Sequence, residues 1–88
     1  MPVVKFFAGL RQTAGSKETF VEAGSLREAL DELVVKIPEM HAKVWDGSRL
    51  RPYVNVTVNG QTLTSEEELN RPLEPGDTIA IFPPIAGG

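Results

Sequence analysis

Short runs of alternating hydrophobic and polar residues occupy most of this chain, and hydrophobic residues recur at helical spacing in only one segment. Alternation with a period of two indicates a β-strand with one buried face, and β-branched and aromatic residues favour the same structure. We therefore expect five short strands, at residues 3–8, 17–22, 51–58, 61–63 and 78–82. The run at 51–58 is the clearest, because valine occupies every second position from 54 to 58.

The helical pattern lies between residues 25 and 37. Apolar residues recur there three or four positions apart, at Leu26, Ala29, Leu30, Leu33, Val34 and Ile37. Ser25 and Glu28 match a capping box, in which the serine hydroxyl accepts the amide of residue 28 and the glutamate reaches back. Pro38 ends the pattern because proline cannot continue the hydrogen bonds of a helix. We expect one amphipathic helix of about three and a half turns.

Glycine, proline and asparagine mark the connections between these elements. Residues 9–16 contain two glycines, and we expect them to form a loop that separates the first strand from the second. Asn59-Gly60 predicts a two-residue hairpin turn, because both turn positions need a positive φ. Residues 73–77 predict a tight turn into the last strand.

Residues 39–50 carry no clear period, and we expect Met40 and Trp45 to form a lid over the end of the helix. The order of elements is then β-β-α-β-β-β. A single helix covers only one face of a sheet, so the other face is left to water or to a partner. We expect an α+β fold with a mixed four- to five-stranded sheet wrapped on one main helix. A single domain spans residues 1–82, and a flexible tail follows at residues 83–88.

The composition of the chain argues against several classes of function. The net charge of −3 argues against a nucleic-acid partner, which calls for a basic surface. The chain has no cysteine, which excludes a disulfide framework and a thiolate nucleophile, and His41 has no second ligand at metal spacing, so we expect no metal site. No apolar run approaches the roughly 18 residues that cross a bilayer. The first residues lack the basic segment followed by an apolar segment that is typical of a signal peptide. We therefore expect no membrane partner and a cytoplasmic location.

Strand parity places two phenylalanines on the open face of the sheet. In the first strand Lys5 should face water, so Phe7 shares its face, and the helix-facing positions are then Val4, Phe6 and Ala8. In the last strand the two isoleucines suit the core, which leaves Phe82 outside, and Tyr53 falls on the same face by parity. Two phenylalanines beside the root of the tail are a candidate partner-binding patch. Packing of the two rings on each other or under a loop is the structural alternative.

The chain closes on Pro83-Pro84-Ile85-Ala86-Gly87-Gly88. The two prolines hold the first part of this tail extended, and six residues span at most about 20 Å. A terminal glycine has a free carboxylate with no Cβ beside it, so it can enter a channel too narrow for any side chain. The tail therefore favours chemistry at the carboxylate of Gly88, against the alternative of an ordinary frayed terminus.

Three stretches together resemble the ubiquitin-like sulfur carriers, most closely the small subunit of molybdopterin synthase. They are Phe6-Phe7-Ala8-Gly9-Leu10-Arg11-Gln12, the turn and strand Leu73-Glu74-Pro75-Gly76-Asp77-Thr78-Ile79-Ala80-Ile81-Phe82, and the closing Pro83-Pro84-Ile85-Ala86-Gly87-Gly88. With the hairpin at residues 54–60, the likeness covers nearly the whole chain. This resemblance implies a β-grasp, or ubiquitin-like, fold.

The resemblance also implies a chemistry. Members of that family carry sulfur as a thiocarboxylate on the terminal glycine, here Gly88, after an E1-like adenylating enzyme has activated the carboxylate with ATP. The chain has no phosphate-binding glycine loop of its own, so we expect no bound cofactor and assign the ATP to the partner. The sulfur then passes to a large synthase subunit or another sulfur-accepting enzyme. Arg11 matches an arginine that the family usually has, and it is a candidate for pairing with acidic groups of the activating enzyme.

The sequence leaves other functions open. The sulfur could serve cysteine or thiamine synthesis instead of molybdopterin synthesis. From a different class, the activated Gly88 could be joined to a lysine, as in ubiquitin-like protein modifiers. Finally, the chain could be a non-covalent β-grasp binding module in which the two terminal glycines are incidental.

Overall fold

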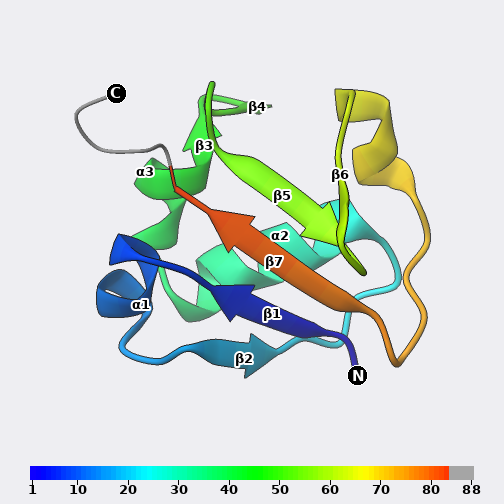
Figure 1. The fold of residues 1–88 in the computed structure, drawn as a ribbon, viewed down its shortest axis with the longest axis horizontal. Helices are drawn as coiled ribbons and strands as arrows, with labels where there is room; N and C mark the ends of the chain where they lie inside the picture. Colours follow the sequence, from blue (N-terminus) through cyan, green and yellow to red (C-terminus); the bar gives the residue numbers. More distant parts are fainter. Residues whose placement is uncertain (84–88) are drawn as a thin grey trace.

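The computed structural model describes residues 1–83, which form a five-stranded sheet with one long helix across one face (Figure 1). The sheet contains β1 (Val3–Phe6), β2 (Glu18–Phe20), β5 (Asn55–Val58), β6 (Gln61–Thr62) and β7 (Thr78–Phe82), in the order β2-β1-β7-β5-β6. A separate two-stranded ribbon pairs β3 (Trp45–Asp46) with β4 (Arg49–Leu50). The helices are α1 (Gly9–Ala14), α2 (Leu26–Lys36), α3 (Met40–Val44) and the 3₁₀ helix η1 (Glu66–Asn70).

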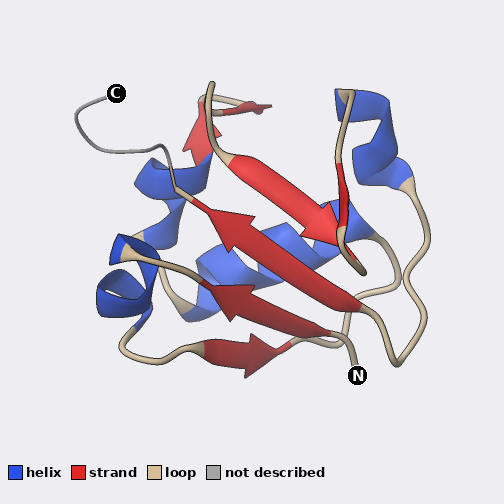
Figure 2. Ribbon diagram, in the orientation of Figure 1, coloured by secondary structure: helices blue, strands red, loops and turns tan. Residues whose placement is uncertain are grey.

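The sheet is mixed, as expected. β1 and β7 pair in parallel at its centre, with Phe6 opposite Ile81, and every other neighbouring pair is antiparallel. The face nearest the viewer in Figure 2 carries no helix within residues 1–83, because α2 lies behind the sheet. This arrangement confirms the predicted α+β class with one covered and one open face, and the strand predicted at residues 78–82 is confirmed residue by residue.

The core lies between α2 and the covered face of the sheet. Ser25 caps α2 by accepting a hydrogen bond from the Glu28 N–H at 3.2 Å, which is the first half of the predicted capping box. Alternation decides what each strand contributes, and the fully buried strand residues are Val4, Phe6, Val56, Val58, Ile79 and Ile81. From α2 the buried residues are Leu26, Ala29, Leu30 and Leu33. Burial of each of the larger side chains among them, the valines, leucines, isoleucines and phenylalanine, stabilises the fold by about 1.5–3 kcal/mol.

The loop predicted at residues 9–16 is wrong, because most of this segment is the helix α1. Leu10 is the one buried residue of α1, and Ala14 packs on the core only partly buried, so these six residues leave no periodic signal. Gly15, with a φ of 73°, ends the helix in the left-handed conformation that glycine adopts freely. Ala8 turns the chain into α1 with a φ of 52° and is exposed, so the expectation that it faces α2 is also wrong.

Two further differences concern residues 39–58. The segment without a clear period contains α3 and the β3–β4 ribbon, whose elements are too short to produce a pattern. The expected strand at 51–58 is shorter, since β5 begins at Asn55. Before it, the Val54 N–H donates to the Arg51 carbonyl across a turn. Tyr53 lies in that turn with a φ of 70° and is 83% exposed, so strand parity does not place it on the open face.

The outer edge of the sheet at β2 has side-chain donors on its outward carbonyls. The Lys36 ammonium donates to the Phe20 carbonyl from α2, and the Ser16 hydroxyl donates to the Glu18 carbonyl at 3.1 Å. Successive residues of β2 direct their backbone groups alternately toward β1 and away from it. The Phe20 and Glu18 carbonyls are among those that point away.

A hydrogen-bonded pair ties the turn before β7 to the hairpin after β5. The Asp77 carboxylate accepts from the Glu74 N–H at 2.8 Å and from the Asn59 side-chain Nδ2 at 2.9 Å, and the Asn59 side-chain Oδ1 accepts from the Thr78 N–H at 2.9 Å. Asn59 also has the positive φ predicted for the hairpin, at 51°. These bonds, first that from Glu74 and then that from Asn59, hold the pKa of Asp77 below its ordinary value of 3.8.

The lowered pKa of Asp77 predicts an acid-dependent contribution to stability. The contribution is fully present above pH 3.8, the ordinary value, and is lost as the pH falls through the lower folded pKa. The difference in unfolding free energy between the wild type and Asp77→Asn should therefore be largest near neutral pH and shrink below pH 3.8. Chemical denaturation of both proteins at a series of pH values measures this. A difference that stays constant down to the acid limit contradicts the assignment.

Candidate functional site

Phe7 and Phe82 stack on each other on the open face of the sheet, at the end where β1 and β7 terminate. Phe6 lies opposite Ile81 in a parallel pair. Because successive side chains of a strand point to opposite faces, the residues that follow, Phe7 and Phe82, both project from the other face of the sheet. The ring centroids are 4.5 Å apart with an interplanar angle of 16°. Both side chains are half-buried. The patch predicted by parity thus exists as a stacked pair, so its rings pack on each other and still reach solvent.

Arg11 joins this pair from α1. Its guanidinium carbon lies 5.4 Å from the centroid of the Phe7 ring, and its Nε donates to the Phe6 carbonyl at 2.9 Å. This hydrogen bond and the cation–π contact fix the direction of a side chain that is otherwise exposed. The three residues expected to bind a partner, Phe7, Phe82 and Arg11, are therefore adjacent. Sequence reasoning missed how Arg11 gets there, because the positive φ of Ala8 and the helix that follows it carry no strong pattern.

A shallow recess of about 230 Å³ adjoins the stacked rings. Its wall includes Phe7, and its charged lining residues are Lys5, Arg11, Lys17 and Glu18. Three cations face one carboxylate, so the recess favours an acidic group of a partner even though the whole chain has a net charge of −3. Lys17 was not among the sequence candidates, since only the pairing of β2 with β1 brings it beside Phe7.

The tail leaves the sheet directly beside this cluster, because Pro83 follows Phe82. The remaining tail candidates, Pro84, Ile85, Ala86, Gly87 and Gly88, lie outside the described residues. The assignment of sulfur chemistry to Gly88 stays a prediction. Within residues 1–83, no group of three or more potential ligands gathers as a metal site, and no helix is long and apolar enough to cross a bilayer.

Comparison with known sequences identifies relatives over nearly the full length of the chain. The model of the ThiS family matches residues 4–88. The small archaeal modifier protein 1 of Haloferax volcanii is 34% identical, with 96% of this chain and 97% of the relative covered. The molybdopterin synthase sulfur carrier subunit of Escherichia coli is 35% identical, with 97% of this chain and 96% of the relative covered.

Solved structures show the same fold. The crystal structure of the small archaeal modifier protein 1 from Haloferax volcanii has a TM-score of 0.85 at 32% identity, over 99% of this chain and 98% of the other. A chain in the crystal structure of the Amycolatopsis orientalis BexX/CysO complex has a TM-score of 0.87 at 25% identity, over the whole of both chains. These matches confirm the expected β-grasp, ubiquitin-like fold.

The stacked pair predicts an energetic coupling between Phe7 and Phe82. Offset or parallel aromatic pairs contribute about 0.5–1.5 kcal/mol beyond area burial, so Phe7→Leu and Phe82→Leu should be non-additive by that amount in a double-mutant cycle. Unfolding free energies of the four proteins measure it. Phe20 is the matched control, because it lies opposite Val3 on the same face and about 13 Å along the strand from Phe7. A cycle that combines Phe20→Leu with Phe7→Leu should be additive. An equal coupling energy in both cycles contradicts a specific interaction between Phe7 and Phe82.

Proposed function

This chain belongs to the ThiS family of ubiquitin-like sulfur carriers, and we propose that its own reactive group is the carboxylate of Gly88, which carries sulfur as a thiocarboxylate. The observation that carries the proposal is that the family match runs through Gly88, so that the closing Gly87-Gly88 falls within it. The fold agrees with a carrier, because the described residues hold a compact platform from whose sheet the tail leaves at Pro83.

The chemistry follows from the low reactivity of a carboxylate. Activation joins the Gly88 carboxylate to AMP and releases pyrophosphate from ATP, which a partner enzyme binds. The terminal sulfur of a persulfide then displaces AMP, and a thiol reduces the resulting acyl disulfide to the thiocarboxylate. The chain supplies the main-chain carboxyl and the docking surface, and its lack of cysteine is consistent with sulfur held on the main chain.

The docking surface that we assign to the activating and sulfur-accepting partners is the cluster of Phe7, Phe82 and Arg11. Aromatic residues and arginine are enriched among the residues that dominate binding energy. The cluster also lies where β7 ends, so a partner bound there holds the root of the tail near its own active site. The cationic recess beside Phe7 adds a preference for a partner with acidic groups on its rim.

For the acceptor of the sulfur we propose molybdopterin synthesis. The support is the 35% identity to the sulfur carrier subunit of molybdopterin synthase over almost the whole of both chains, together with the opening and closing motifs quoted above. The large synthase subunit would then receive the tail, and the protein itself would be its non-catalytic small subunit. Carriers for cysteine or thiamine synthesis use the same activated end, so the partner enzyme distinguishes them.

A second candidate function is protein modification, which the similarity to small archaeal modifier proteins 1 and 3 favours. Here the activated Gly88 is transferred to a lysine amine of another protein, and AMP leaves as before. This function predicts higher-mass adducts in a lysate that contains the activating enzyme and ATP. Such adducts should disappear when Gly88 is deleted, and their absence with the intact chain contradicts this candidate.

The first prediction of the proposal concerns the mass of the intact protein. Incubation with an E1-like adenylating enzyme, ATP and a sulfur donor should raise the mass by the difference between one sulfur and one oxygen atom. A variant with one alanine added after Gly88 is the control, and it should keep its mass because its end no longer fits the activating site. An unchanged mass of the natural chain under conditions that load a known carrier contradicts the proposal.

The second prediction concerns docking. Phe82→Ala should weaken the complex with the activating enzyme by about 1–3 kcal/mol, because it removes a ring that anchors the contact. Titration calorimetry measures the affinity, and Phe20→Ala provides a control from the same open face, at the far end of β2. If Phe82→Ala binds as tightly as the wild type, the stacked pair is structural only.

A further inference from the structure

The turn that joins β5 to β6 contains a dipeptide with a covalent chemistry of its own. In Asn59-Gly60 the carboxamide of an asparagine precedes the nitrogen of a residue that has no side chain to hinder it. Attack of that nitrogen on the carboxamide carbon closes a succinimide ring, and this reaction is one reason why asparagine is thermolabile. The other two asparagines, Asn55 and Asn70, precede valine and arginine, whose side chains hinder the same attack. Asn59 is therefore the asparagine of the chain that is best placed to react.

The nucleophile of this reaction is accessible. Gly60 is exposed, and within residues 1–83 its N–H donates no hydrogen bond. A Cβ added to Gly60 would meet no atom within 4 Å, so the turn is open to solvent at this point. The structure around Gly60 therefore offers no obstacle to the attack.

The electrophile is held by the chain at the start of β7, which lies beside this turn (Figure 1). The Asn59 side-chain Nδ2 donates to the Asp77 carboxylate at 2.9 Å, and its Oδ1 accepts from the Thr78 N–H at 2.9 Å. The main-chain N–H of Asn59 donates to the Thr78 carbonyl at 2.8 Å. Because both polar atoms of the carboxamide have partners on the neighbouring segment, the group must leave them before its carbon can approach Gly60.

We propose that Asn59-Gly60 is a site of spontaneous deamidation in this protein and that the bonds of Asn59 to Asp77 and Thr78 set its rate. When these bonds open, the Gly60 nitrogen forms a bond to the carboxamide carbon of Asn59. The side-chain nitrogen leaves as ammonia and takes up the proton that the Gly60 nitrogen loses. Water then opens the succinimide ring, and position 59 becomes aspartate or isoaspartate. The bond to Asp77 is the stronger of the two constraints, because its acceptor is charged.

The product does not fit the network that held the asparagine. A carboxylate at position 59 still accepts from the Thr78 N–H, but its second oxygen takes the place of Nδ2 and faces the Asp77 carboxylate. The two like charges repel, and Asp77 loses a hydrogen-bond donor. Deamidation thus loosens the start of β7, the strand that ends at Phe82. This consequence does not depend on the chemistry of Gly88.

Peptide mapping by mass spectrometry measures the reaction, because each conversion replaces an NH group by an oxygen atom. The full chain is incubated at mildly alkaline pH, both in its native state and unfolded in guanidinium chloride. We expect Asn59 to react at least about tenfold more slowly in the native chain, since only the fraction with an open network reacts. Asn55 and Asn70 are internal controls in the same digests and should stay unchanged. Equal rates in the two states, or no reaction of Asn59 in the unfolded chain, overturn the proposal.

Two variants then test the role of Asp77. Asp77→Ala should raise the rate in the native state about tenfold, because it removes a hydrogen bond to a charged group. Glu74→Ala is the matched control, since it removes a carboxylate from the same turn while its main-chain N–H can still donate to Asp77. This control should react at the rate of the wild type, and thermal unfolding checks that both variants are folded. A rate for Asp77→Ala equal to that of the wild type, or an equal rise in both variants, overturns the proposal.

The effect of the product is tested without waiting for the reaction. Asn59→Asp should lower the midpoint of thermal unfolding. Its combination with Asp77→Asn exchanges the carboxylate and the amide, so that the amide at position 77 donates to the carboxylate at 59 and still accepts from the Glu74 N–H. The double variant should therefore recover much of the lost midpoint. An unchanged midpoint in Asn59→Asp, or no recovery in the double variant, overturns the conclusion that the product opposes Asp77.

Discussion

The parallel pairing of β1 with β7 positions both the stacked Phe7–Phe82 pair and the point at which the chain leaves the sheet. The two strands lie side by side at the centre of the sheet, with Phe6 opposite Ile81. One residue further on, Phe7 and Phe82 meet on the open face, and the chain leaves the sheet at Pro83 beside them. The register is secure because a slip of one residue would turn every buried side chain of a strand toward water. A contact between residues 75 positions apart therefore rests on ordinary core burial.

Much of this arrangement was predictable from alternation and turn chemistry. The last strand, the helix capped by Ser25 and the Asn59-Gly60 hairpin all follow from local patterns of several residues that agree with one another. The failures are segments in which a single residue decides the structure. Leu10 is the one buried residue of α1, and the left-handed conformation of Tyr53 removes it from a strand that parity would have extended. Of the site, parity could find Phe7 and Phe82, but the placement of Lys17 depends on tertiary pairing that no short pattern encodes.

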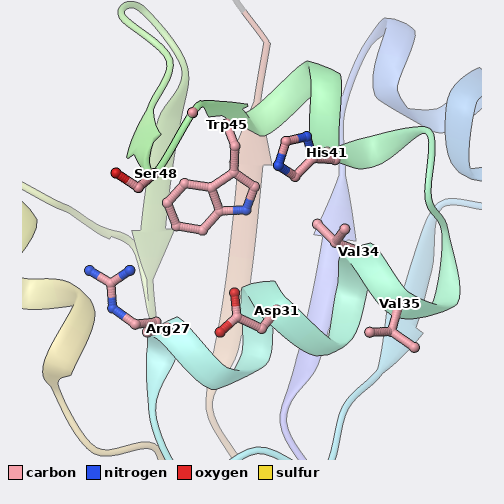
Figure 3. Close-up of a pocket in the computed structure, with 8 residues that line it drawn as sticks. Arg27, Asp31, Val34, Val35, His41, Trp45 and Ser48 are labelled. Atoms are coloured by element: carbon pink, nitrogen blue, oxygen red, sulfur yellow. The ribbon is translucent and has the colours of Figure 1, made fainter.

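The two faces of the molecule are built from different elements. On the open face, the site is built on strands, and its aromatic rings and cations follow from sheet register. On the helical side, a second recess is built where α2, α3 and the β3–β4 ribbon meet, and its base is a tryptophan that sequence reasoning took for a lid (Figure 3). Trp45 is buried there, and the Arg27 guanidinium carbon, near the start of α2, lies 6.0 Å from the centroid of its ring.

The side-chain donors along β2 have a consequence for association. An edge strand with unsatisfied carbonyls is a template on which another chain can extend the sheet, which leads to aggregation or to strand-addition complexes. At Phe20 and Glu18 these acceptors are already occupied by Lys36 and Ser16. A newly arriving strand would have to break both bonds before forming its own. These two bonds therefore disfavour sheet extension along β2 and favour recognition of a partner through side chains.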